Sequence, residues 1–413
     1  MERIQTRVAW GLVAALCLLV LAALAGIAQG GPLDPPSGPG STQRELIFQP
    51  ANCAAFPVSI SLPGSYLLAE NITIPAACAK NGIEISAPDV DLDLNGFTVG
   101  GAGAPSLAGI ADTALIDMVT IRNGQVRSWG GAGLDFGTTG HVTVADVQAS
   151  YNGGGGMLLS GAAQMSNCRA IGNTGTGISV GSRSDISGCN ADGNAGAGFV
   201  MPDSSLADCN ATGNGGTGIS VSSGAVVNCV ANGNGTGGIS VSDTTITDCA
   251  ANGNTGVGIT LFSSSLTDCT ANGNTMDGIL ANETVITECS VELNGDDGIE
   301  STTSAEISRC VVTLNTAEGI EVAYGSYVLD NDVNLNSSNG ILVTSLGNRI
   351  DGNNLVDNSG PQVNVTGAGN TIVRNSVGGF GLGYFFAAGN TTGPLEGAAI
   401  PAPLVNPWAN IWY

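Results

Sequence analysis

Acidic side chains are concentrated in one part of this 413-residue sequence. Thirteen Asp or Glu residues and one basic residue, Arg309, lie between positions 268 and 332. Three acidic residues occupy the same place in consecutive repeats, directly before a Gly-Ile pair: Asp277, Asp297 and Glu318. Carboxylates stacked about 5 Å apart raise one another's pKa or recruit a cation. A cation site or an acid–base pair is therefore expected in this stretch.

These acidic residues have three interpretations: a calcium site, a catalytic site, or an acidic surface with no site. A calcium site would draw on five carboxylates: Asp277, Asp297, Glu300, Glu318 and Glu321. A catalytic set would use Asp296, Asp297 and Glu318, together with Arg309, the one basic residue of this stretch. Carboxylates one repeat apart are spaced roughly as in retaining glycosidases, and those two repeats apart roughly as in inverting ones. The alternative is a solvated acidic face that keeps the protein soluble.

A repeat of 20 residues, with an occasional 21, must position these side chains. Its most regular column contains eight cysteines: Cys168, Cys189, Cys209, Cys229, Cys249, Cys269, Cys289 and Cys310. Each cysteine has an apolar residue three positions before it, Asn five positions after it, and Gly followed by Ile or Phe from the ninth position after it. Helical repeats are longer, and leucine-rich repeats need more Leu than these units contain. Short strands separated by tight corners remain.

The repeat predicts an all-β fold, a single right-handed parallel β-helix (β-solenoid) of about 14 coils with 20–27 residues and three short strands per coil. Stacked coils place equivalent residues above one another at about 4.8 Å. The corner Asn side chains are expected to hydrogen-bond along their own column. The cysteines are expected to form a buried ladder of small apolar side chains, with disulfides between coils as the alternative.

Five segments are expected along the chain. Residues 1–28 read as a signal peptide, because Arg3 and Arg7 precede an apolar run; an uncleaved membrane anchor is the alternative. Residues 29–49 form a Gly/Pro/Ser-rich linker, 50–81 an N-terminal cap, 82–375 the β-helix and 376–413 a C-terminal cap. Cys53 and Cys78 are expected to form a disulfide in the exported cap. Trp408, Trp412 and Tyr413 are expected to cover the last coil.

Composition excludes several classes of protein. The 63 glycines exceed the 34 acidic and 11 basic residues together, and 43% of the chain is hydrophobic, which excludes disorder and disfavours helices. The net charge of −23, with one lysine, argues against nucleic acid and anionic membranes as partners. A single histidine, His141, makes a histidine-based metal site improbable. Cations, neutral glycans and proteins remain.

Several segments resemble the secreted bacterial right-handed parallel β-helix proteins of the pectin-lyase-like superfamily. These segments are "ISLPGSYLLAENIT", "NGIEISAPDVDLDLNGFTVGG", "VTIRNGQVRSWGGAGL", the "C-x-A-x-G-N" repeats and the closing "WANIWY", and the resemblance spans residues 58–413. It implies the fold, whereas the superfamily's functions vary. Of the motifs used by polygalacturonases, only the Asp-Asp pair has a counterpart, Asp296-Asp297, and Arg309 is the one counterpart of a pectate lyase base.

The predicted function is an exported binding or structural module of the cell envelope or extracellular space, with polysaccharide or a cell-surface glycan as partner. The protein is expected to be a monomer that requires no cofactor, with calcium as the candidate ligand. The alternative is a polysaccharide lyase or glycoside hydrolase that uses the acidic repeats 277–321, so enzymatic activity is left open. Arg122, Arg127 and Trp129 suggest a further platform for an acidic sugar.

Overall fold

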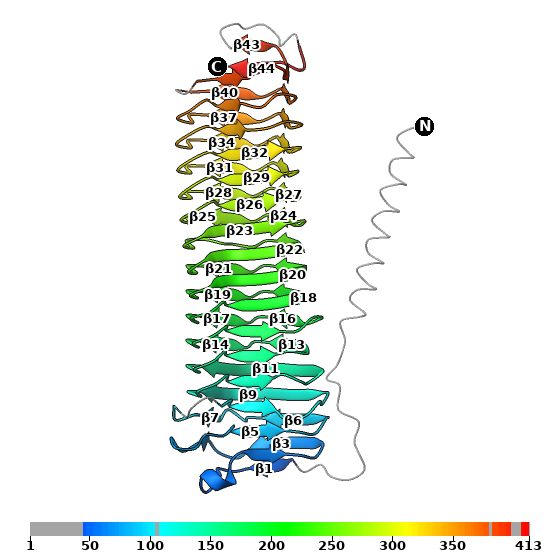
Figure 1. The fold of residues 1–413 in the computed structure, drawn as a ribbon, viewed down its shortest axis with the longest axis vertical. Helices are drawn as coiled ribbons and strands as arrows, with labels where there is room; N and C mark the ends of the chain where they lie inside the picture. Colours follow the sequence, from blue (N-terminus) through cyan, green and yellow to red (C-terminus); the bar gives the residue numbers. More distant parts are fainter. Residues whose placement is uncertain (1–43, 104–106, 380–381, 398–405, 413) are drawn as a thin grey trace, which may run out of the picture. The chain divides into compact units, whose positions relative to one another are not determined.

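The computed structural model describes residues 44–103, 107–379, 382–397 and 406–412. The signal peptide expected at 1–28 and most of the linker expected at 29–49 lie outside these residues. Residues 45–413 form one unit, in which the strands stack as successive coils (Figure 1). Apart from the short 3-10 turn η1 (Cys53–Ala55), every regular element described is a strand, and neighbouring strands are parallel.

Each coil contributes to three ladders of strands. The first ladder contains the apolar residue that follows Gly in each repeat, together with the equivalent residues of the end coils. Its strands are β2 (Val58–Ile60), β5 (Ile83–Ile85), β8 (Ile110–Asp112), β10 (Leu134–Phe136), β12 (Met157–Leu159), β15 (Ile178–Val180), β18 (Phe199–Ala207), β20 (Thr217–Val227), β22 (Gly237–Thr247), β23 (Val257–Phe262), β26 (Ile279–Asn282), β29 (Ile299–Thr303), β32 (Ile320–Tyr324), β35 (Ile341–Val343), β38 (Val363–Val365) and β41 (Tyr384–Phe386).

The second ladder shares the long strands β18, β20 and β22 with the first. Its other strands are β1 (Glu45–Ile47), β3 (Gly64–Leu68), β6 (Val90–Asp93), β9 (Val119–Arg127), β11 (His141–Ser150), β13 (Ala162–Ser166), β16 (Asp185–Ser187), β24 (Ser265–Thr267), β27 (Val285–Thr287), β30 (Glu306–Ser308), β33 (Tyr327–Leu329), β36 (Arg349–Asp351), β39 (Thr371–Val373) and β42 (Thr391–Thr392).

The third ladder shares β9 and β11 with the second. Its other strands are β4 (Ile72–Thr73), β7 (Thr98–Gly100), β14 (Arg169–Ile171), β17 (Asn190–Asp192), β19 (Asn210–Thr212), β21 (Val230–Asn232), β25 (Thr270–Asn272), β28 (Ser290–Glu292), β31 (Val311–Thr313), β34 (Asp332–Asn334), β37 (Asn354–Val356), β40 (Ser376–Gly378), β43 (Leu395–Gly397) and β44 (Asn410–Trp412).

The alternation of buried and outward residues explains why these short segments form strands. In β15, Ile178 and Val180 are buried and Ser179 lies between them on the outer side. The same register places Ile219, Ile239 and Ile259 directly above one another in the core. Burying an apolar side chain of this size contributes about 1.5–3 kcal/mol. Each coil therefore gains most of its stability from the coils above and below it.

A buried asparagine ladder confirms the predicted role of the corner Asn residues. Asn214 donates from Nδ2 to Oδ1 of Asn234 at 3.1 Å, and its backbone N–H donates to the same oxygen at 3.0 Å. The pattern repeats through consecutive coils from Asn152 to Asn358. Each side chain thus satisfies backbone groups that the corner would leave buried without partners.

The eight cysteines form a second buried ladder with free thiols. The backbone N–H of Cys168 donates to Sγ of Cys189 at 3.3 Å, and the thiol of Cys189 donates to the carbonyl of Ser187 at 3.4 Å. The column then changes residue type, because the N–H of Cys310 donates to Oδ1 of Asn331 at 2.8 Å. Sulfur therefore accepts the same backbone donor that an Asn oxygen accepts in later coils.

The stack has about 16 turns, compared with the 14 expected. The additional turns lie at the ends: β2 pairs with β5, and β41 pairs with β38. Near the first turn, Cys53 and Cys78 form a disulfide with Cα atoms 5.5 Å apart. At the other end β44 pairs with β40, but Trp408 and Trp412 are more than half exposed, and Tyr413 lies outside the described residues. Residues 410–412 therefore lie on the last coil, and the two tryptophan side chains face partly into solvent.

Trp129 belongs to the core, which corrects the expectation of an aromatic platform. Its side chain is 1% exposed, and Nε1 donates to the carbonyl of Val99 at 3.0 Å. A Cβ on Gly82 would lie 2.8 Å from the Trp129 ring, so the indole fills space that the neighbouring coil leaves. Arg122 is paired with Asp91 and Asp93. Within the described part of the chain, no helix has the length and apolarity needed to cross a membrane.

Candidate cation site

Three coils bring the acidic column together at the start of β26, β29 and β32. Asp277, Asp297 and Glu318 each precede a glycine that is packed against the next coil. A Cβ on Gly278 would lie 2.7 Å from the carbonyl oxygen of Gly298, so only glycine fits there. The close approach of the coils at this point stacks the preceding carboxylates in one column.

Backbone hydrogen bonds hold two of these carboxylates in place. Oδ1 of Asp277 accepts the N–H of Asp297 at 3.2 Å, and Oδ1 of Asp297 accepts the N–H of Glu318 at 2.8 Å. Asp277 and Asp297 are each only 6% exposed. Glu300 and Glu321 are paired in adjacent strands and half-buried on the outer side beside this column. The five residues therefore form one acidic surface over three coils.

The carboxylates form two overlapping groups with the spacing of cation ligands. In the first, oxygen atoms of Asp277, Asp297 and Glu300 lie within 4.8 Å of one another. In the second, Asp297 is grouped in the same way with Glu318 and Glu321. Calcium binds oxygen ligands at about 2.3–2.6 Å, so two ligands of one ion lie at most about 5 Å apart. Each group fits around a single ion, and Asp297 can contribute to both.

The charges of these groups disfavour their simultaneous ionisation. Burial, with repulsion from Glu300 and Asp296, raises the pKa of Asp277 to about 6. Burial, with repulsion from Glu318 and Glu321, raises the pKa of Asp297 to about 8. The pKa of Glu321 is raised mainly by burial. Near neutral pH the cluster therefore holds a proton, or a cation that replaces it.

The structure separates Arg309 from this cluster, contrary to the sequence-based catalytic set. Arg309 lies at the corner between β30 and β31, where Nε donates to Oε1 of Glu288 at 2.8 Å. It is therefore unavailable as a base beside Asp297 or Glu318. Asp296 does lie near the cluster, since its charge raises the pKa of Asp277 and Glu321, but it is exposed.

Three polar residues beyond Glu318 belong to the same network and were missed in the sequence. Ser338 Oγ and Asn339 Nδ2 each donate to Oε1 of Glu318 at 2.8 Å. Asn364 donates from Nδ2 to Oδ1 of Asn339 at 3.1 Å, and its own Oδ1 is buried with no hydrogen-bond partner in the described part of the chain. Asn339 could have been recognised, because it precedes Gly340-Ile341 in the same column as the acids.

Comparisons with known proteins establish the family. The family model described as "Right handed beta helix region" matches residues 96–227 and 224–333, which together exceed half of the chain. The protein therefore belongs to the right-handed β-helix family, which confirms the resemblance and the fold inferred from the sequence. A search of curated proteins by sequence found no match.

Several solved structures are similar in fold. The A-module of Azotobacter vinelandii mannuronan C-5 epimerase AlgE6 is 14% identical, with 82% of this chain and 90% of that chain covered and a TM-score of 0.36. The periplasmic alginate epimerase AlgG is 12% identical, with 85% of this chain and 77% of that chain covered and a TM-score of 0.27. Bacteriophage CBA120 tailspike protein 3 is 12% identical, with 85% of this chain and 60% of that chain covered and a TM-score of 0.32. Likeness at this level gives no information about activity.

Proposed function

We propose that this protein is an exported binding module whose acidic coils hold calcium and, through it, an acidic polysaccharide. The observation that carries the proposal is the pair of overlapping carboxylate groups centred on Asp297, each with oxygen atoms within 4.8 Å. Across the described residues, the ion pairs between side chains include none of the five carboxylates. A divalent cation would supply the missing positive charge and satisfy several carboxylate oxygens at once.

A bound cation would leave coordination positions open toward solvent. Asp277 and Asp297 are buried and lie on the inner side of the cluster, whereas Glu300 and Glu321 are half-buried on its outer side. Calcium takes six to eight oxygen ligands, more than either group of three carboxylates supplies unless some bind through both oxygens. Carboxylates of an acidic sugar chain are suitable additional ligands, and they would otherwise be repelled by this surface.

The outer side of the first ladder supports an extended ligand. On the coils preceding the cluster, outward Ser220, Ser240 and Thr260 lie in register on adjacent strands. Their hydroxyl groups form a polar column along the direction in which the coils stack, and Leu280 separates this column from Glu300. Export is supported by the Cys53–Cys78 disulfide, which is typical of proteins in oxidising compartments. We therefore propose that the module acts in the cell envelope or extracellular space.

Calorimetric titration with CaCl₂ tests the cation, and co-sedimentation with polygalacturonate tests the glycan. We expect saturable Ca²⁺ binding that Asp297→Asn abolishes, and polygalacturonate binding that requires Ca²⁺. Asp248→Asn is a matched control, because it removes one charge from an exposed corner where Asn228 occupies the same column. Absence of Ca²⁺ binding refutes the site, whereas Ca²⁺ binding without polygalacturonate binding refutes only the glycan.

One observation favours a second candidate function, hydrolysis of a glycan. With a pKa raised to about 8, Asp297 carries a proton at neutral pH and could act as a general acid, with Glu318 or Glu300 as the second carboxyl group of the pair. Reducing-sugar release from neutral and uronic-acid polysaccharides tests this directly. Activity that Asp297→Asn abolishes would establish hydrolysis, and no release from any substrate would exclude it for those substrates.

A further inference from the structure

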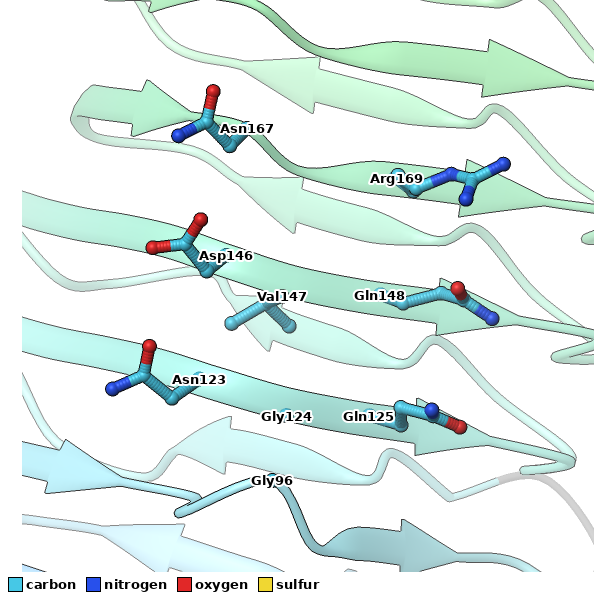
Figure 2. A pocket seen from close by; sticks show the side chains of 9 residues that line it. All are labelled: Gly96, Asn123, Gly124, Gln125, Asp146, Val147, Gln148, Asn167 and Arg169. Atoms are coloured by element: carbon cyan, nitrogen blue, oxygen red, sulfur yellow. The ribbon is translucent and has the colours of Figure 1, made fainter.

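A hollow lies on the outside of β9, β11 and β14, far along the sequence from the acidic coils. It is an open, shallow depression of about 420 Å³. Figure 2 shows two columns of side chains on its sides. The first column lies at the corner between the second and third ladders and contains Asn123, Asp146 and Asn167; the second lies on the third ladder and contains Gln125, Gln148 and Arg169.

The backbone explains why the first column projects at this bend. Asn123, Asp146 and Asn167 have φ values of 58°, 55° and 53°, in the left-handed region that Asn and Asp tolerate better than most residues. This conformation turns the chain between the two ladders. Gln148 stands in register with Gln125 on one side and Arg169 on the other. Each column therefore has one side chain per coil, and the two columns line the hollow across three coils.

Most of these side chains retain free hydrogen-bonding capacity. The side chains of Gln125, Asp146 and Asn167 make no hydrogen bond to any residue that the structure describes. Gln148 makes only a long contact, with Nε2 3.4 Å from Oγ of Ser150. Asn123 donates to Oδ1 of Asp93 at 3.2 Å, so its own oxygen remains free.

The same two columns are paired internally in the next coils. Asn210 donates to Oδ1 of Asn190 at 3.0 Å in the column of Gln125, and Asn228 donates to Oδ1 of Asp208 at 2.6 Å in the column of Asn123. In those coils the polar groups satisfy one another along the ladder. In the hollow they are left to water or to a ligand.

The chemistry of the lining selects the type of ligand. Amide groups both donate and accept hydrogen bonds, and so do the hydroxyl groups of a sugar. Asp146 and Arg169 contribute one charge of each sign, so the hollow is neutral in a protein with a net charge of −23. Without a bridging cation an acidic ligand would be repelled by the protein as a whole, and an apolar ligand would find mainly polar side chains. We propose that this hollow binds a segment of a neutral, hydroxyl-rich glycan that lies across the three coils.

This site is independent of the acidic coils and of calcium. It uses β9, β11 and β14, whereas the carboxylate groups lie at β26, β29 and β32. A protein with both sites would hold a neutral and an acidic sugar chain at separate places on one stack. Loss of either site by mutation should leave the other intact.

Calorimetric titrations with cellohexaose, xylohexaose and maltohexaose, all in EDTA, test the proposal. We expect at least one to bind saturably, and Gln125→Ala/Gln148→Ala to weaken that binding about tenfold or more. The matched control is Asn190→Ala/Asn210→Ala, which changes the same column where the amides are paired with each other, and it should change affinity less than twofold. Thermal unfolding of each variant verifies that it folds. If Gln125→Ala/Gln148→Ala does not fold, Gln148→Glu replaces it, because Glu keeps the shape of the side chain but loses the amide N–H donors.

The possible results are distinguishable. The proposal is overturned if none of the three hexasaccharides binds. It is also overturned if Gln125→Ala/Gln148→Ala and the control Asn190→Ala/Asn210→Ala weaken binding equally. Binding that Asp297→Asn abolishes would place the neutral sugar on the acidic coils and would also overturn it. Failure of this site leaves the calcium proposal unaffected, because the calcium titration uses neither the hexasaccharides nor the variants of Gln125 and Gln148.

Discussion

Replacement of Asp297 by Asn should make the cation-free protein more stable at high pH. Asp297 has an ordinary pKa near 3.8 in the unfolded chain, and burial raises its pKa in the folded protein to about 8. A carboxyl group that binds its proton more tightly when folded contributes stability below pH 4, and this contribution is lost as the pH rises through 8. Asn has the same shape without the charge, and its Oδ1 can still accept the N–H of Glu318.

The magnitude follows from the rise in pKa. Each tenfold change in proton affinity corresponds to about 1.4 kcal/mol, so the rise in the pKa of Asp297 corresponds to about 5–6 kcal/mol without screening. Solvent reaches the outer side of the cluster, and screening should lower this to about 2–3 kcal/mol. At pH 5 folded Asp297 is already protonated, and the advantage of the Asn variant should fall to about 1 kcal/mol or less.

Urea unfolding in EDTA at pH 5 and pH 9.5 measures this difference. We expect a higher midpoint for Asp297→Asn than for the parent protein at pH 9.5, with similar midpoints at pH 5. Addition of CaCl₂ at pH 9.5 should stabilise the parent protein, by about 2.7 kcal/mol when the ion is present at 100 times its dissociation constant, and should leave the variant unchanged. An equal advantage at both pH values, or none at pH 9.5, would refute the account of the cluster.

Three further predictions concern the scaffold. Asn234→Ala should destabilise the protein by about 2–4 kcal/mol in urea unfolding, because it leaves buried groups of two neighbouring coils without partners; exposed Asn210→Ala should cost less than about 1 kcal/mol. Leu314 has a φ of 60° at a corner where earlier coils have Gly, so Leu314→Gly should keep thermal stability within about 1 kcal/mol, whereas β-branched Leu314→Val should lower it. The eight ladder thiols are buried and should react with a thiol reagent only after unfolding; rapid labelling of the native protein would contradict the ladder.

The repeat made the fold predictable because each column has one physical task. Small buried cysteines and corner asparagines recur every 20 or 21 residues, and the structure stacks both as continuous ladders. The end coils were harder to recognise. Val58 follows Pro57 instead of Gly, and Tyr384 replaces the usual Ile, so these strands lack the Gly-Ile signature although they pair with the same ladder.

The site was predictable only where it interrupts the repeat. Asp277 and Asp297 replace neutral residues in a regular column, and this substitution identified the acidic coils. The position of Arg309 was not evident from its proximity in sequence, because 21 residues complete a turn and a nearby residue can lie on another side of the coil. Trp129 was misjudged because only the structure shows the space left by Gly82. The polar hollow was missed because Gln125 and Gln148 belong to coils of 23–27 residues that precede the regular repeats.

Anomalous diffraction from crystals soaked in a calcium-mimicking lanthanide such as Tb³⁺ would test the central claim most directly. The account predicts an anomalous peak bounded by carboxylate oxygens of Asp297 and either Glu300 with Asp277 or Glu318 with Glu321. Soaking with excess CaCl₂ should weaken this peak by competition. Peaks confined to exposed acids such as Asp248, with none beside Asp297, would contradict it.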